Sequence, residues 1–218
     1  MMNRPAATRA RRVEKEAAVT AVQQPLALVT VLTLVDTAQL VQKILGEAFP
    51  SCAFAVSVHS TGAGTLLDVA WTDGPRADQV GRFVHPLQAR RLAHGGRAVA
   101  VEHFTLTPVG YRTVRLAADR ISLTRAFSDA AVERALTVCE RRYRDRLSPD
   151  DRAAMTVERY RAGALCGVEI EGVHRTGGQR TGSCLQSDVD EILCGGTDVT
   201  GFPRSPTAAA LFARSDVH

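Results

Sequence analysis

The side chains that could perform acid–base chemistry are two aspartates, Asp68 and Asp73, and three histidines, His59, His85 and His103. A carboxylate placed beside an imidazole can act as the general acid or base of a hydrolysis. The spacing of these residues, however, fixes no histidine beside either carboxylate. A small hydrolase-type enzyme that uses Asp68 and Asp73 with one histidine is therefore the alternative interpretation of the sequence.

The preferred interpretation gives both aspartates structural roles. Asp73 belongs to a WTDGP run, in which Gly74 can turn the chain and Pro75 fits the first turn of a helix. The Asp73 carboxylate is predicted to accept backbone N–H groups at the start of that helix. Asp68 is predicted to be a solvated carboxylate on the polar face of a strand.

The cysteines and the remaining histidines do not form a recognisable site. Five cysteines make an odd set without a CxxC pair, which indicates neither a disulfide framework nor a zinc ribbon and is typical of a reducing compartment. His94 and His103 offer two imidazoles, but the spacing places no third metal ligand beside them. The sequence therefore predicts no metal site and no cofactor.

A β-hairpin must position the two aspartates. Apolar residues alternate in residues 54–58 and again in residues 67–71, with a glycine-containing turn at 60–64 between them. This pattern predicts two strands that share one apolar face. Trp71, at the end of the second strand, is expected to anchor the core or the strand edge.

The other periodic segments alternate between strands and helices. Strands are predicted at residues 26–34, 98–106 and 111–124, and helices at 36–49, at 76–89, after Ser128 and at 148–161. The order strand, helix, strand, strand, helix, strand, with a final helix, indicates an α+β fold. We expect a small mixed or antiparallel sheet with helices packed on one face, in a split βαβ-like arrangement.

Composition divides the chain into three parts. Residues 1–24 are basic and are predicted to be a disordered arm, and residues 25–147 form the α+β domain. Residues 148–218 are predicted to be a short helix followed by a Gly-rich, weakly structured tail. The domain thus carries flexible N- and C-terminal tails.

The hairpin region also carries a family resemblance. It contains Phe49-Pro50, Phe54-Ala55-Val56 and Asp68-Val69-Ala70-Trp71-Thr72-Asp73-Gly74-Pro75, followed later by Asp119-Arg120-Ile121 and Arg125-Ala126-Phe127-Ser128. Over about Leu34–Tyr143 the chain resembles the large polyvalent protein-associated domain of type twenty-nine. The resemblance implies a module of large proteins carried by phages and conjugative elements, and it implies no catalytic residues.

Positive charge is concentrated in residues 76–147, which hold fourteen basic and seven acidic side chains. Such a segment is compatible with nucleic acid or another polyanion. A high-GC codon bias is the alternative explanation, because the chain has twenty-five Arg and two Lys. The candidate interaction residues are arginines of the predicted strands and of one helix end: Arg112, Arg115, Arg120, Arg125, Arg141, Arg142 and Arg144.

These observations favour a non-enzymatic interaction module of a mobile genetic element that contacts a nucleic-acid backbone or a host protein. The enzyme alternative, and a domain remnant without an independent role, stay open. The apolar run at residues 25–35 is too short to span a bilayer. A cytoplasmic protein without a membrane partner is therefore predicted.

Overall fold

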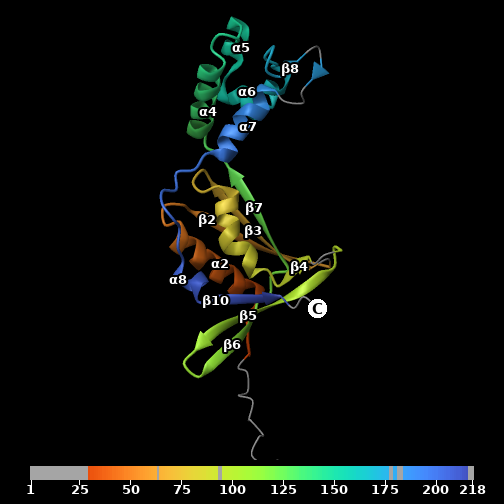
Figure 1. The fold of residues 1–218 in the computed structure, drawn as a ribbon, viewed down its shortest axis with the longest axis vertical. Coiled ribbons are helices and arrows are strands. Elements are labelled where there is room, and N and C mark those ends of the chain that lie inside the picture. The colour runs from red at the N-terminus through yellow and green to blue at the C-terminus, as the bar shows by residue number, and fades with distance from the viewer. Residues whose placement is uncertain (1–28, 63, 93–94, 177–178, 181–183, 216–218) are drawn as a thin grey trace, which may run out of the picture.

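The computed structural model describes residues 29–62, 64–92, 95–176, 179–180 and 184–215. It contains helices and two larger mixed sheets, so the predicted α+β class is confirmed. Both larger sheets lie toward one end of an elongated molecule, and the helices that follow residue 128 lie mostly toward the other (Figure 1). The predicted basic arm, residues 1–24, lies outside the described residues.

The predicted hairpin is present and supplies two of the three strands of the smaller of these sheets. Strand β2 (Phe54–Thr61) pairs antiparallel with β3 (Gly64–Thr72), and β7 (Arg120–Ala126) lies parallel to β3 on its other side. Leu67 and Val69 of β3 are fully buried, because alternate side chains of this central strand face the covering helices.

The larger sheet has five strands. Its main path is β1 (Val29–Val31), β6 (Gly110–Arg115), β5 (Ala98–Thr107) and β10 (Leu211–Ser215), and β4 (Arg90–Leu92) also pairs with β5. Only the β1–β6 pair is parallel. The last strand of this sheet therefore comes from the end of the chain.

The structure divides the strands between two sheets, where a single sheet was expected. The reason lies in the segment between β6 and β7, where Leu116 and Ala118 are buried in the core. Asp119 then accepts hydrogen bonds from the backbone N–H and the hydroxyl of Thr65, at 2.9 and 3.0 Å. These contacts carry the chain from one sheet to the other, so that β7 pairs with β3.

Two helices complete the core beneath both sheets. Helix α2 (Leu34–Ala48) contributes Val41, Ile44 and Leu45, and α3 (Ala77–Val84), which continues into the 3-10 turn η1 (His85–Leu87), contributes Val80 and Val84. A capping box starts α2, with Thr33 at the N-cap and Asp36 three residues later. Helix α2 therefore begins at Leu34, two residues before the predicted start at residue 36.

A second core lies among the helices after β7. They are α4 (Asp129–Arg142), α5 (Pro149–Ala154), α6 (Val157–Arg161), η2 (Ala164–Gly167) and α7 (Leu185–Gly195). Two short strands, β8 (Arg175–Thr176) and β9 (Gln179–Arg180), form a small hairpin between η2 and α7. Within this core the buried His174 accepts the Ile170 N–H at Nδ1, so its Nε2 donates to Asp188 at 2.9 Å.

The C-terminal segment differs from the predicted weakly structured tail. In α7 the buried residues Leu185, Val189 and Leu193 pack against α4. These residues are spaced i, i+4, i+8 and therefore form a stripe on one face of a helix. The glycines around them make this helical pattern difficult to recognise in the sequence. Helix α8 (Pro206–Ala209) and strand β10 then return the chain to the first core.

The Arg125 guanidinium joins the two cores. Its Nε and Nη2 donate to the carbonyls of Asp73 and Gly74, at 3.0 and 2.9 Å. Its Nη1 donates to the carbonyls of Leu193 and Gly196 at the end of α7, at 3.2 and 3.0 Å. The negative end of the α7 dipole also favours a cation there.

The WTDGP turn presents these carbonyls. Asp73 and Gly74 both have positive φ, 58° and 65°, and the Trp71 indole donates to the Pro75 carbonyl at 2.9 Å. The Asp73 carboxylate accepts the N–H of Ser128, the N-cap of α4, at 2.9 Å. Asp73 therefore supports the start of α4, not the start of the helix after Pro75.

We expect Arg125→Lys to destabilise the protein by about 2 kcal/mol, because an ammonium cannot reproduce the planar fork that serves four carbonyls. The free energy of unfolding from urea titration would measure this. Arg120→Lys is the matched control, since Arg120 is an exposed residue of the same strand. Equal losses in the two variants would contradict the joining role of Arg125.

The position of α8 depends on Glu47 of α2. The Glu47 carboxylate accepts from the hydroxyls of Ser205 and Thr207, both at 2.6 Å, and from the Thr207 N–H at 3.0 Å. The hydrogen bonds from Ser205 and then Thr207 lower the pKa of Glu47 from 4.5 to about 2. The carboxylate is therefore ionised in the folded protein above that pH.

A depressed folded-state pKa stabilises the protein above the unfolded pKa, and this stabilisation is lost as the pH falls through the folded one. We therefore expect wild type to have a higher melting temperature than Glu47→Gln at pH 7. The difference should shrink between pH 4.5 and about 2. Melting temperatures of both proteins across this pH range would test the prediction, with Glu133→Gln on α4 as the control. A difference in melting temperature that does not change with pH would refute the role of the Glu47 charge.

Candidate functional site

A groove runs along one side of α3 and η1. It consists of two adjoining pockets of about 570 and 900 Å³, which share Arg82, Pro86 and Ala213. We call it the basic groove, because its lining includes four arginines: Arg82, Arg90, Arg91 and Arg204. Segments far apart in the sequence thus line one groove.

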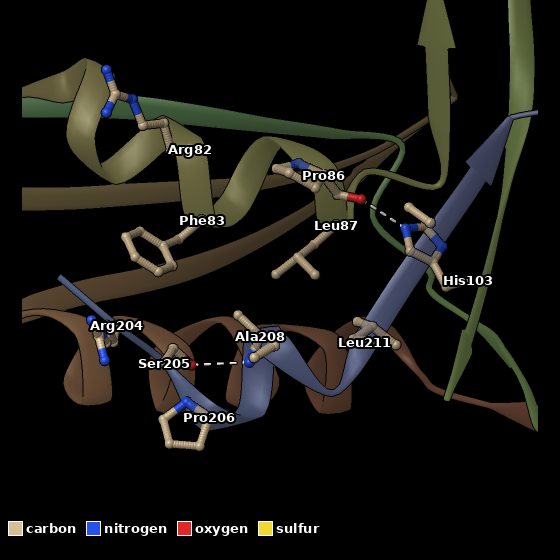
Figure 2. Close-up of a pocket in the computed structure, with 12 residues that line it drawn as sticks. Arg82, Phe83, Pro86, Leu87, His103, Arg204, Ser205, Pro206, Ala208 and Leu211 are labelled. Carbon is tan, nitrogen blue, oxygen red and sulfur yellow. Dashed lines mark hydrogen bonds between the residues drawn. The ribbon is translucent and has the colours of Figure 1, made fainter. Parts of the chain in front are cut away.

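The smaller pocket has an apolar centre. Figure 2 shows Arg82 and Arg204 at one end and His103 at the other, with Phe83, Leu87 and Leu211 between them. Ser205 caps α8 by accepting the Ala208 N–H at 3.0 Å. The Glu47 contacts with Ser205 and Thr207 hold the α8 side of this pocket against α2.

The larger pocket is more polar, and its arginines differ in how they are paired. Arg90 lies 3.1 Å from Asp119. Arg82 lies 3.9 Å from Asp78, a carboxylate that Arg76 holds more closely, at 3.0 Å. Hydrogen bonding from Arg76 lowers the pKa of Asp78. Arg82 is thus an exposed guanidinium with only a loose ion pair.

Arg91 and Arg204 add two further exposed cations to the groove. No ion pair joins either of them to a carboxylate in the described part of the chain. Exposed arginines along a groove can bind carboxylates or phosphates with two parallel hydrogen bonds. The groove therefore has the chemistry of an anion site.

His103 supports the groove as a neutral side chain. It is 1% exposed, and its Nε2 lies 2.8 Å from the Pro86 carbonyl, which can only accept. Nε2 therefore carries the hydrogen, and Nδ1 has no hydrogen-bond partner in the described structure. Burial lowers the pKa of His103, because the charged ring would be desolvated. Its hydrogen bond ties β5 to η1.

The structure places Asp68, but not Asp73, beside a histidine. His59 Nε2 lies 3.0 Å from Asp68 Oδ2 and 3.4 Å from Ser57 Oγ, on the exposed face of the hairpin. A Ser-His-Asp relay uses the two different ring nitrogens, whereas both contacts here involve Nε2. Asp73 instead binds Ser128. Burial would raise the pKa of Asp73, but the Ser128 hydrogen bonds and nearby arginines lower it.

The arginines predicted as interaction residues lie in three places. Two are exposed on β6, two lie on β7, and three lie at the end of α4, toward the opposite end of the molecule from β6 (Figure 1). One of the β7 pair, Arg125, is occupied by backbone carbonyls. The β6 pair is Arg112 and Arg115, the β7 pair is Arg120 and Arg125, and the three at the end of α4 are Arg141, Arg142 and Arg144.

The groove arginines were not among those predictions. Arg82 lies on a helix, Arg90 and Arg91 on a short strand, and Arg204 on the segment before α8. Only the tertiary fold brings them together, although the paired Arg90-Arg91 close behind Pro86 is a sequence signal that could have drawn attention to the region.

The described residues contain no group of three or more His, Cys, Asp and Glu side chains placed to hold a metal ion. None of their helices combines the length and the apolar character needed to cross a membrane. All five cysteines are free thiols, and burial raises the pKa of the most enclosed, Cys139, to about 11.

Comparison with known proteins identifies a family. Residues 32–145 match the model of the family described as large polyvalent protein associated domain 29. No curated protein and no solved structure matches the chain. The matched segment runs from the start of α2 through α4 and includes the hairpin, the WTDGP turn and three of the four groove arginines. Because it makes up more than half of the chain, this protein belongs to the large polyvalent protein associated domain 29 family.

Proposed function

We propose that this protein is a non-enzymatic interaction module of a mobile genetic element and that it binds the phosphate backbone of nucleic acid in the basic groove. The family supports the setting, since its domains are associated with large polyvalent proteins. The observation that carries the binding role is that Arg82, Arg91 and Arg204 line one groove made of two adjoining pockets, with Arg82 shared by both.

The charge of the groove favours an anionic ligand. Its lining holds four arginines and one acidic residue, Asp78. That carboxylate is already engaged by Arg76, which is not part of the lining. A phosphate oxygen can therefore approach Arg82 without strong competition from Asp78. Each phosphate neutralised by an arginine releases counterions, which makes the binding depend on salt.

The geometry of the groove suits a chain of phosphates better than one small anion. The arginines come from three separate segments and line two adjoining pockets. Their side chains are exposed, so they contribute little to folding and remain accessible to a ligand. Contacts of this kind position a backbone without reading its sequence.

We expect the full chain to bind a fluorescent oligonucleotide of about 20 nucleotides, with an affinity that falls steeply between about 50 and 200 mM salt. The variant Arg82→Gln/Arg91→Gln/Arg204→Gln should weaken binding at low salt by about tenfold or more and reduce the salt slope by about two to three. Fluorescence anisotropy across a salt series would measure both quantities.

The matched control is Arg141→Gln/Arg142→Gln/Arg144→Gln, which removes the same charge from the predicted interaction residues at the end of α4. It should retain most of the affinity. Loss of binding in this control alone would move the interface to α4. The absence of any salt-sensitive complex with the wild-type protein would overturn the proposal.

A further inference from the structure

The outer face of the five-stranded sheet carries three neighbouring aromatic side chains. Phe104 of β5 lies directly opposite Phe212 of β10, and Leu106 of β5 lies opposite Tyr111 of β6. The Phe104 ring is 5.5 Å from that of Phe212, nearly parallel to it, and 6.1 Å from that of Tyr111. We call Phe104, Tyr111 and Phe212 the aromatic face.

This face is the one that the core does not use. Strand residues of alternate parity, such as His103 and Val114, are buried toward the helices. Tyr111 and Phe212, by contrast, are 58% and 41% exposed. Apolar neighbours on the same face are exposed as well: Val29, Val31 and Leu106. A continuous patch of exposed apolar side chains can mark an interaction surface.

The charge of the sheet indicates what kind of partner this surface would meet. Its five strands contain five arginines and one acidic residue, Glu102. Two of the arginines lie on the same face as the aromatic rings: Arg115 by its register with Val31, and Arg214 two residues after Phe212. Arg214 is also 2.7 Å from Glu102. A cationic sheet with stacked aromatic rings complements a polyanion that has flat, apolar groups.

Single-stranded nucleic acid has this combination of groups. Its unpaired bases can stack on aromatic side chains, while its phosphates meet the surrounding cations. In a duplex the base faces are already stacked on one another, so aromatic rings on an open sheet cannot reach them. The surface should therefore distinguish single strands from duplexes.

We propose that the aromatic face binds single-stranded nucleic acid, with about two or three bases stacked on Phe104, Tyr111 and Phe212 and phosphates near Arg115 and Arg214. This inference rests on the proposed function and names its substrate class. The basic groove lies on the opposite side of β5 and β10, where Val101, His103 and Ala213 line it. The two surfaces therefore make separable contributions.

The test uses the full chain with a single-stranded oligothymidylate and a duplex of equal length. Tyr111→Leu/Phe212→Leu removes two exposed rings and keeps apolar side chains, so we expect the fold to persist. This variant should lose about tenfold or more of its single-strand affinity. Its duplex affinity and its salt slope should be unchanged, because the cations remain.

Phe202→Leu is the matched control, because Phe202 is an aromatic residue that is 91% exposed and lies outside the sheet. It should bind both oligonucleotides as wild type does. Circular dichroism and thermal melting would verify that all variants are folded.

The outcomes separate this inference from the proposed function. Salt-sensitive binding that depends on the groove but not on Tyr111 and Phe212 would overturn the aromatic-face inference alone. Single-strand binding that depends on these two rings but not on the groove arginines would overturn the groove assignment alone. A variant that changes the sedimentation coefficient but not the affinity would assign the face to self-association, and an absence of binding would overturn both proposals.

Discussion

The structure depends on one guanidinium group that serves four backbone carbonyls. Arg125 contacts two carbonyls of the WTDGP turn and two at the end of α7, so it connects the two hydrophobic cores. A planar fork with several fixed donors can satisfy such a set, whereas a single ammonium cannot. The positive φ of Asp73 and Gly74 is part of the same arrangement, because it directs the turn carbonyls toward Arg125. Asp73 adds a second connection through Ser128, at the start of α4.

The residues that connect the two cores are different from the residues that are accessible at the surface. Arg125 and Asp73 are occupied within the protein, whereas Arg82, Arg91, Arg204 and two rings of the aromatic face, Tyr111 and Phe212, are exposed. The groove and the aromatic face lie on opposite sides of β5 and β10, so one sheet presents cations on one side and stacking rings on the other. The closing strand β10 and helix α8 lie beyond the matched family segment. The C-terminal part of this chain therefore completes both surfaces.

Local sequence patterns predicted much of the secondary structure. Strict alternation in β2 and β3 predicted the hairpin, and the predicted helices correspond closely to α2, α3 and α4. The prediction was poorer wherever a long-range contact decided the outcome. The start of α2 differs only locally from the prediction: the helix begins at Leu34 and not at residue 36, because Thr33 and Asp36 form a capping box. The Gly-rich C-terminal segment was predicted to be weakly structured, yet Leu185, Val189 and Leu193 pack against α4. Strand β10 is short and is stabilised by pairing with β5.

The sequence by itself determined the α+β class, the hairpin and the family, because each depends on residues close together along the chain. It also showed that positive charge is concentrated in residues 76–147. Only the tertiary structure decided which arginines lie along one groove, since Arg82, Arg91 and Arg204 are brought to it by the packing of α3, β4 and the segment before α8 around β5. The tertiary structure also decided that Arg125 donates hydrogen bonds to backbone carbonyls within the protein and that Phe104, Tyr111 and Phe212 lie on one face of the sheet. The physical reason is that side-chain convergence depends on strand register and on packing between distant segments, which periodicity within a segment does not specify.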